Sequence, residues 1–272
     1  MEVIILSSPE RVYKEVSQRI IAAINKKPDT VLGLATGQTM LGIYQEIIAA
    51  YNKGDVDFSS VVTFNLDEYL GIAPTDSKSF RFYMEENLFK HVNINIKNVN
   101  IPSSIPENVE EECEKYEEKI KQKGGIDLQL LGIGRDGHIG FNEPSSSLLA
   151  RTRVKTLTEE TLRDNFGEGQ CPRFAITVGT GTILEAREII LVALGEHKAE
   201  AIAKTVEGPV SASCPASALQ LHPKVKVIID ESASKLLKRK DYYAWVWEHK
   251  KEVNDLRLIT PIPGPEYKKK QS

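Results

Sequence analysis

The sequence has only three cysteines, no long hydrophobic run and no large excess of either charge, and each of these features argues against a class of protein. Cys113, Cys171 and Cys214 form no Cys-x-x-Cys pair, and their odd number does not suit a disulfide framework. We therefore expect inert free thiols and a cytoplasmic location. Apolar stretches such as 189–194 are far shorter than the roughly 20 residues that a membrane-spanning helix needs. The segment 1–6 lacks the basic region and cleavage site of a signal peptide, so we expect no membrane association.

The charge balance is mildly acidic. The 272 residues include 35 Lys and Arg against 38 Asp and Glu, which gives a formal net charge of -3. This balance argues against a broad nucleic-acid-binding surface, whereas an anionic small molecule would need only local positive groups. With 41% hydrophobic and 27% charged residues, the composition is that of a globular protein with an ample core. Collagen-like, coiled-coil and disordered chains are excluded.

Short apolar strands alternate with helical patterns along the chain. Strands are expected at 2–6, 30–34, 61–64, 127–132, 174–178, 189–194 and 225–229. One helix is expected to begin at Pro9, with Ser8 as N-cap, and another runs through Tyr51 after the strand at 30–34 and a glycine turn. Further helices are expected at 80–89, 107–121, 182–186, 197–206 and 232–247. Near-continuous apolar runs such as 128–131 favour buried parallel strands.

This alternation predicts a fold of the α/β class. We expect a single doubly wound, mostly parallel sheet with helices on both faces, in a Rossmann-like arrangement. No internal repeat or linker divides the chain. We therefore expect one catalytic domain over 1–250 and a partly flexible C-terminal extension over 251–272.

Four predicted strand ends carry unusual residues. They are 35–39, 65–69, 132–144 and 195–198. In open α/β sheets, ligands bind outside the carboxyl ends of the strands. The gathering of these segments at strand ends is the main indication of a site.

The longest of these segments contains Gly132, Gly134 and Gly137 in the Gly-x-Gly-x-x-Gly pattern of dinucleotide-binding proteins. That motif needs a helix to follow at once, so that its N-terminus faces the pyrophosphate. The residues at 138–147 include Asn142, Pro144 and three serines, which is loop chemistry. We therefore expect no dinucleotide cofactor.

The same segment suits proton transfer. Asp136, His138 and Glu143 fall within eight residues of glycine-rich backbone, and a histidine oriented by carboxylates can act as a general acid or base. The alternative is that Asp136 and Asn142 only cap turns. A metal site is not predicted, because the segment has one histidine and no cysteine.

Two other strand ends suggest an anion site and a base. Thr36, Gly37, Gln38 and Thr39 lead into a helix and could cradle a phosphate with backbone amides and hydroxyls, although an ordinary strand-to-helix turn has the same residue types. Lys198 would add positive charge there, or it is simply a solvated lysine. Asp67 follows the strand at 61–64, where it is either a general base or a turn-initiating residue.

Taken together, these segments resemble the glucosamine-6-phosphate deaminase family. The resemblance is carried by Leu32–Gly37, Thr63–Tyr69, Gly134–Pro144, Ser147–Arg153 and Ala218–Pro223, and it runs in register from about residue 2 to 240. It implies a cofactor-free aldose–ketose isomerisation coupled to deamination of a small sugar phosphate.

The resemblance also implies a role for each matching residue. Asp67 would move a proton from C2 to C1, and His138 would open the sugar ring, with Asp136 and Glu143 orienting it. The Thr36–Thr39 turn and Lys198 would bind the 6-phosphate. Ser146, Ser147, Arg153 and Lys155 match an allosteric site that N-acetylglucosamine 6-phosphate occupies in some hexameric members.

The chain departs from the family pattern at several positions. Gln38 stands where the family usually has Gly or Ser. The Arg-Phe segment that contributes a phosphate-binding arginine is shortened, which leaves Arg163 and Arg173 as replacements. The segment 213–218 is similar to the shorter, non-allosteric bacterial members. Allostery and homo-oligomerisation therefore stay open.

Three alternatives to the deaminase are a 6-phosphogluconolactonase-like hydrolase, an isomerase of another amino sugar phosphate and a non-catalytic sugar-phosphate sensor. A lactonase shares the fold and the Gly-x-Gly-x-Asp-Gly-His segment but does not need Asp67 as a base. A sensor need not retain Asp67, Asp136, His138 and Glu143 together.

Overall fold

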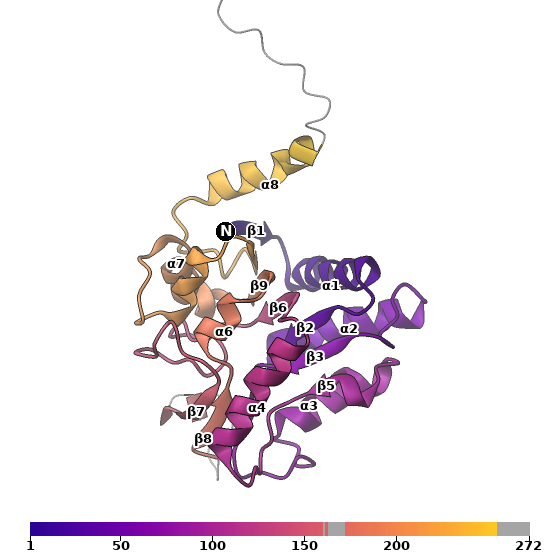
Figure 1. Cartoon of the computed structure of the whole chain (residues 1–272). Coiled ribbons are helices and arrows are strands. Elements are labelled where there is room, and N and C mark those ends of the chain that lie inside the picture. Colours follow the sequence, from indigo (N-terminus) through magenta and orange to yellow (C-terminus); the bar gives the residue numbers. More distant parts are fainter. Residues whose placement is uncertain (160, 163–171, 255–272) are drawn as a thin grey trace, which may run out of the picture.

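A seven-stranded sheet forms the centre of the molecule (Figure 1). The structure is a computed structural model that describes residues 1–159, 161–162 and 172–254. All neighbouring strands of this sheet are parallel. Their order is β1 (Glu2–Leu6), β10 (Val225–Asp230), β9 (Glu188–Ala193), β6 (Leu128–Leu131), β2 (Val31–Leu34), β3 (Val62–Asn65) and β5 (Val99–Asn100).

Helices cover both faces of this sheet. Every residue of β2, β3 and β6 is buried. Because successive side chains of a strand point to opposite faces, both faces must be covered. Figure 1 shows α1 and α2 on one side and α6 and α7 on the other. The helices are α1 (Pro9–Lys26), α2 (Gln38–Asn52), α3 (Phe80–Asn87), α4 (Val109–Gln122), α6 (Thr180–Leu184), α7 (Ala199–Glu207) and α8 (Lys240–Asn254). The predicted doubly wound α/β architecture is confirmed.

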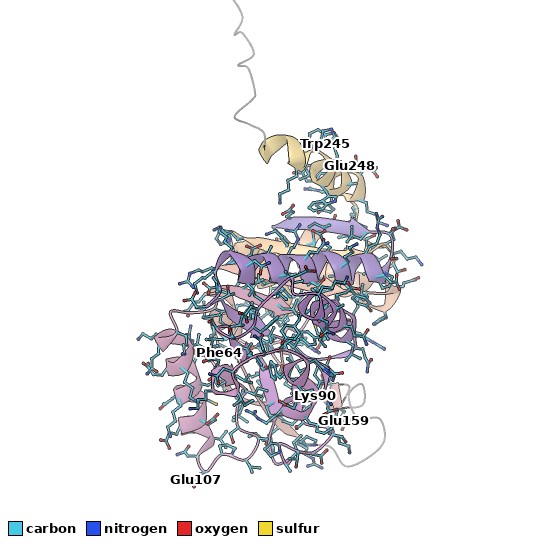
Figure 2. All side chains as sticks on the ribbon, turned by 90° about the vertical axis from the view of Figure 1, so that its right-hand side faces the viewer. Phe64, Lys90, Glu107, Glu159, Trp245 and Glu248 are labelled. Atoms are coloured by element: carbon cyan, nitrogen blue, oxygen red, sulfur yellow. The ribbon has the colours of Figure 1, made fainter. Side chains whose placement is uncertain are left out.

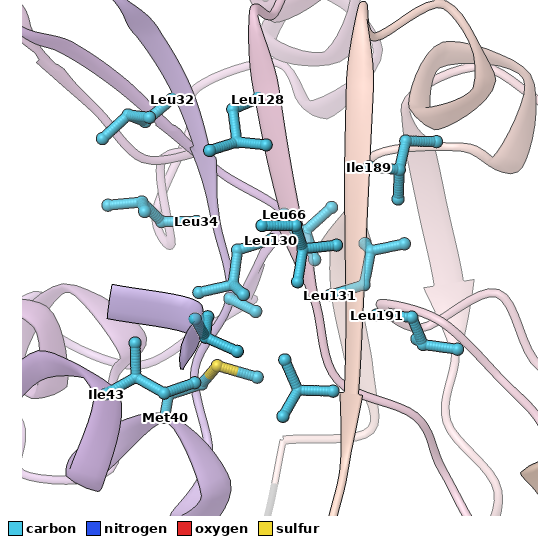
Figure 3. Close-up of a cluster of buried hydrophobic side chains, with 14 of the residues drawn as sticks. Leu32, Leu34, Met40, Ile43, Leu66, Leu128, Leu130, Leu131, Ile189 and Leu191 are labelled. Atoms are coloured by element: carbon cyan, nitrogen blue, oxygen red, sulfur yellow. The ribbon is translucent and has the colours of Figure 1, made fainter. Parts of the chain in front are cut away.

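The central strands carry aliphatic side chains that belong to the main hydrophobic core. Figure 3 shows buried leucine and isoleucine side chains of β2, β6 and β9, with Met40 and Ile43 of α2 on one side of these strands and Ile189 and Leu191 on the other. Burying a leucine or isoleucine side chain contributes about 1.5–3 kcal/mol. This packing holds the carboxyl ends of the three strands in fixed positions.

Helix α1 forms as the sequence predicts. The Ser8 side chain accepts a hydrogen bond from the Arg11 N–H, and Pro9 takes the first helical position. The apolar residues spaced by four are all buried, namely Val12, Val16, Ile20 and Ile24. Capping and periodicity agree here, so local sequence was sufficient.

A second, antiparallel sheet was not predicted. It has three strands in the order β4 (Asp67–Tyr69), β8 (Phe174–Thr177) and β7 (Arg153–Thr156). The segment expected at 174–178 is a strand, but it pairs here rather than with the parallel strands. The reason is long-range pairing, since Asp67 lies opposite Thr177 in the register. Strand β4 is too short to show an alternation of its own.

The helix expected at 232–247 is wrong at its start. The chain makes turns after β10, and α8 begins only at Lys240. The Asp230 carboxylate accepts hydrogen bonds from the Ala233 and Gly195 N–H groups, so it supports a turn in place of a helix. The segment expected as one helix at 197–206 is a 3₁₀ turn, η3 (Glu196–Lys198), followed by α7.

Helix α8 covers the edge strand β1. Tyr243 and Trp247 pack against the core, and Lys250 Nζ lies 2.5 Å from the carboxylate of Glu2. Figure 2 shows α8 at the margin of the molecule, with Trp245 exposed on it. Among the described residues, no helix is both long and apolar enough to cross a membrane. Cys113 and Cys214 are buried free thiols, and Cys171 lies outside the described residues.

Candidate active site

A cavity of about 410 Å³ opens at the carboxyl ends of β2, β6 and β9, where the sequence predicted a site. It collects residues from all four strand-end segments. Of the predicted site residues, Thr36, Gly37, Gln38, Thr39, Asp67, His138 and Lys198 line it. The parallel sheet explains the convergence, because it brings the carboxyl ends of its strands to one edge.

The segment after β6 is a tight loop that presents His138 to the cavity. Gly134 N–H donates to the His138 carbonyl (2.9 Å), and Gly137 adopts a positive φ of 87°. A Cβ at Gly134 would lie 2.2 Å from Cε1 of His138, so the ring packs directly on the glycine backbone. No helix follows Gly137, which agrees with the rejection of a dinucleotide fingerprint.

Asp136 orients His138. Its Oδ1 lies 2.7 Å from Nδ1 of the imidazole and also accepts the His138 backbone N–H (3.0 Å). Burial alone would raise the pKa of Asp136, but the contacts with His138 hold that pKa below its ordinary value. An ionised Asp136 fixes the ring and leaves Nε2 for proton transfer. The pairing of Asp136 with His138 matches the expected arrangement.

Glu143 sits behind the cavity lining. Its Oε1 accepts hydrogen bonds from the hydroxyls of Thr161 (2.7 Å) and Thr158 (3.2 Å), and the residue is 4% exposed. Thr161 itself lines the cavity. The described contacts therefore link Glu143 to the 158–161 segment, where the sequence led us to expect contact with His138.

Asp67 is a buried carboxyl group on the cavity wall. It begins β4 and is 6% exposed. Burial, together with the adjacent charge of Glu68, raises the pKa of Asp67 to about 8. Within the described residues it accepts no hydrogen bond, so its oxygens remain available to a bound molecule. A carboxylate with a raised pKa is a stronger base than an exposed aspartate.

The turn between β2 and α2 has the features of an anion cradle. Gly37 adopts φ 106°, a conformation that favours glycine, and it precedes the first residue of α2. The first turn of α2 carries no acidic residue and no side-chain cap, and Gln38, Thr39 and Met40 line the cavity, so the positive end of the helix dipole lies at this cavity. Lys198 lines the same cavity at the end of η3.

Four further lining residues of chemical interest were not predicted from the sequence. Arg135 and His197 lie in the strand-end segments 132–144 and 195–198, so their place in the sequence could have identified them as site residues. Phe80 and Phe141 form an apolar wall, with their rings stacked at 5.9 Å. Phe80 begins α3, which follows no parallel strand, so no local pattern pointed to it.

The residues matched to an allosteric site lie outside this cavity lining. Arg153 Nη1 donates to Oδ1 of Asn142 (2.9 Å), and this contact links β7 to the loop that carries His138. Ser146 is buried and its Oγ has no partner among the described residues, while Ser147 accepts the Leu149 N–H. Lys155 lies on β7. Their role as a regulatory site stays a prediction.

The two arginines named as replacements for the family's phosphate-binding arginine are Arg163 and Arg173. Arg163 lies outside the described residues. Arg173 is exposed, directly precedes β8 and is not among the described residues that line the cavity. Within the described residues, no group of three or more His, Cys, Asp or Glu side chains could hold a metal ion. The functional groups that the structure brings together here are the carboxyl groups of Asp67 and Asp136, the imidazole of His138 and the turn at Thr36–Thr39.

Comparison with known proteins identifies the family of this chain. A family model described as glucosamine-6-phosphate isomerases/6-phosphogluconolactonase matches residues 8–228. Glucosamine-6-phosphate deaminase of Shewanella halifaxensis is 51% identical over 266 residues, covering 96% of this chain and 99% of that protein.

Solved structures extend the comparison. A monomeric glucosamine-6-phosphate deaminase is 40% identical with a TM-score of 0.84, covering 87% of this chain and 100% of that one. The 6-phosphogluconolactonase from Trypanosoma cruzi has a TM-score of 0.70 at 17% identity, covering 87% and 97%, which shows a shared fold alone. The chain therefore belongs to the glucosamine-6-phosphate isomerase/6-phosphogluconolactonase family of enzymes.

Proposed function

We propose that this protein converts glucosamine 6-phosphate and water to fructose 6-phosphate and ammonia. The observation that carries the proposal is one cavity that combines a buried Asp67, the paired His138 and Asp136, and an anion cradle. Relatives that are about half identical over nearly the whole chain are named glucosamine-6-phosphate deaminases, which supports the same reaction.

In this scheme the phosphate anchors the substrate. It binds the amides of the Thr36–Thr39 turn and the ammonium group of Lys198. Part of that binding energy holds C2 of the sugar against Asp67. His138 opens the ring by transferring the proton of the O1 hydroxyl to O5, and Asp136 keeps the imidazole oriented.

Asp67 then carries the isomerisation. It removes the proton from C2 while a proton of the substrate ammonium group passes to O1, which gives an enolamine. Asp67 returns its proton to C1, which leaves a hydroxymethyl group at C1 and a protonated imine at C2. Water adds to the imine, and ammonia leaves as the ketone forms. A protonated substrate amine near Asp67 would lower the pKa of this carboxyl from about 8, so the base would ionise when substrate binds. No step in the scheme needs a cofactor.

Three further points complete the proposal. We infer a cytoplasmic protein, in line with the buried free thiols of Cys113 and Cys214. Homo-oligomerisation and activation by N-acetylglucosamine 6-phosphate through Ser146, Ser147, Arg153 and Lys155 remain hypotheses. Measuring the mass in solution and the rate with that sugar phosphate added tests both, and the related deaminase that is monomeric provides the reference.

The deciding experiment compares the wild type with Asp67→Asn in an assay for ammonia and fructose 6-phosphate. We expect turnover by the wild type and a loss of about 10²–10⁴-fold in kcat for the variant, because a general base is removed. The absence of product from the wild type would refute the deaminase proposal. Unchanged turnover by the variant would remove Asp67 from its role.

Thermal stability provides the control for folding. The folded-state pKa of Asp67, about 8, lies above the ordinary value of 3.8, so the unfolded chain holds fewer protons than the fold between those values. The wild type therefore loses stability as pH rises from about 4 to 8. Asp67→Asn has no such loss, and we expect its Tm at pH 8 to exceed that of the wild type. An inactive variant with a lower Tm would point to misfolding instead.

A further inference from the structure

Glu68 is a buried carboxylate to which the proposed reaction assigns no step. It follows Asp67 in β4 and is 1% exposed. Its oxygens accept three backbone N–H groups, each at 2.9 Å, from Tyr69, Phe80 and Arg81. A buried charge is costly unless it is hydrogen-bonded, so these three N–H groups stabilise the Glu68 carboxylate at this position.

Two of these donors belong to the first turn of α3. The Phe80 and Arg81 N–H groups have no partner within a helix, so Glu68 acts as a cap from outside, while Ser79 Oγ accepts the Phe82 N–H (3.0 Å). A negative charge is favourable at a helix N-terminus. Glu68 thereby fixes α3 relative to the strand that carries Asp67.

The hydrogen bonds between Glu68 and the first turn of α3 also position one wall of the cavity. Phe80 lines the cavity, and its ring centroid lies 4.6 Å from that of Tyr69 and 5.9 Å from that of Phe141. Moving the first turn of α3 would therefore move this aromatic wall. In the proposed reaction, that wall faces the sugar held against Asp67.

Glu68 also shapes the electrostatics of Asp67. Successive residues of a strand point to opposite faces, so Asp67 reaches the cavity while Glu68 points toward α3. The other titratable or charged groups that face Asp67 come from α4, the loop after β6 and the segment after β9. Tyr116 interacts electrostatically with Asp67, and Arg135, His138, His197 and Lys198 line the same cavity, with Asp136 paired to His138.

We propose that Glu68 is a positioning residue of the active site: it clamps α3 and the Phe80 wall, and it places a fixed negative charge beside Asp67. The proposal rests on the proposed function for its kinetic test. Its electrostatic consequence is that Glu68 helps to keep the pKa of Asp67 raised and makes this carboxylate a stronger base.

The test uses Glu68→Gln, which removes the charge, and Glu68→Asp, which keeps the charge but shortens the reach to α3. The matched control is Glu207→Gln. Glu207 also accepts two backbone N–H groups, from Lys238 and Arg239, and a hydroxyl from Tyr243, but it lies outside the described cavity lining. The pH profile of kcat/KM is measured for all four proteins. The substrate's own ionisations are common to them and cancel in the comparison.

We expect the acidic limb of the profile to move down by about one pH unit in Glu68→Gln, because loss of a like charge lowers the pKa of Asp67. Glu68→Asp keeps the limb near its wild-type pH but raises KM severalfold through the loosened Phe80 wall. Glu207→Gln changes neither the pH of the acidic limb nor KM. A limb that stays in place in Glu68→Gln, or a wild-type KM in Glu68→Asp, would overturn the corresponding half of the proposal.

A direct titration separates this proposal from the reaction itself. The carboxyl of Asp67 can be followed by ¹³C NMR in the wild type and Glu68→Gln without any substrate. A lower Asp67 pKa in the variant supports the proposal even if the wild type releases no ammonia, and an unchanged pKa refutes it. Should Glu68→Gln fail to fold, the KM of Glu68→Asp still decides the clamp.

Discussion

Asp67 and Glu68 carry the same functional group but differ in what surrounds it. Three backbone N–H groups oppose the rise that burial causes in the pKa of Glu68. Asp67 receives no such donors within the described residues, and burial with the neighbouring charge raises its pKa to about 8. Adjacent carboxyl groups in different environments can thus take different tasks, one as a base and one as a structural anion.

Gly134 leaves the space that the His138 ring occupies. Its φ is not positive, so alanine suits the backbone there, but the new Cβ would lie 2.2 Å from Cε1 of His138. The imidazole would have to swing away from Asp136. We expect Gly134→Ala to lower kcat by about 10²-fold, the usual contribution of a positioned acid or base, with little change in Tm.

Gly132→Ala is the comparison for this variant. Its Cβ would meet only Cε of Met40 at 3.4 Å, which is ordinary contact, so a much smaller loss is expected. Steady-state kinetics and thermal melts of both variants provide the check. Equal losses of kcat would show that crowding of the cavity, rather than displacement of His138, is responsible.

At the scale of elements, the antiparallel sheet anchors the loop that bears His138. Thr177 Oγ1 accepts the Phe141 N–H (2.9 Å), and Asn142 Nδ2 donates to the carbonyls of Ile139 and Val178. Arg153 of β7 completes the link through Oδ1 of Asn142. The small sheet therefore joins Asp67, in β4, and the His138 loop in one assembly.

Asn142→Ala should break this assembly. The buried amide makes three hydrogen bonds, and its loss removes a donor from the carbonyls of Ile139 and Val178 and an acceptor from the Arg153 guanidinium. We expect a destabilisation of about 2–3 kcal/mol and a fall in kcat between about tenfold and 100-fold, as the loop shifts. Urea denaturation and steady-state kinetics measure the two effects.

Asn93→Ala is the matched control for this prediction. Asn93 also accepts a backbone N–H, from Phe58, and donates to Asp57, but it lies on an exposed loop outside the described cavity lining. It should lose some stability and keep its kcat. If Asn142→Ala retained wild-type turnover, the anchoring role of the small sheet would be wrong.

At the scale of the whole molecule, a net charge of -3 does not oppose an anionic ligand. Asp67 is the only acidic residue among the described residues that line the cavity, whereas Arg135 and Lys198 are cationic. The acidic residues are concentrated elsewhere, for example in the first turn of α4. We therefore expect the local charge at the turn after β2, rather than the net charge, to decide whether an anion binds.

The cavity and the C-terminal helix are separate in sequence. All described lining residues fall between Ala35 and Lys198, whereas α8 covers the edge strand β1. We therefore expect a chain that ends at Asn254 to keep kcat/KM within about twofold, because it retains every described residue, and to keep its Tm within a few degrees. This truncation tests the predicted boundary between the domain at 1–250 and the extension.

A chain that ends at Arg239 is the contrasting variant. It removes Tyr243 and Trp247 from the core and uncovers β1, so we expect its Tm to fall by roughly 10 °C. Calorimetry of the two truncations measures the difference. A loss of activity in the longer chain at unchanged Tm would mean that residues after Asn254 contribute to the site.

The amino-acid pattern by itself determined the parallel sheet, helix α1 and the four segments where the site lies. Apolar strand runs, the Ser8 cap and the spacing of buried residues in α1 are local signals that the fold obeys. Carboxyl ends of parallel strands share one edge of a sheet, so the strand pattern alone predicts that Thr36–Thr39, Asp67, His138 and Lys198 converge.

Only the tertiary structure decided the antiparallel sheet, the burial of Asp67 and the position of Phe80, because these features depend on contacts between distant segments. The pairing of Asp67 with Thr177 creates the antiparallel sheet and buries the base. The approach of α3 supplies the donors that occupy Glu68 and brings Phe80 into the cavity wall. Desolvation and hydrogen bonding at a carboxyl group are set by these neighbours, and no local pattern around residues 67–68 specifies them.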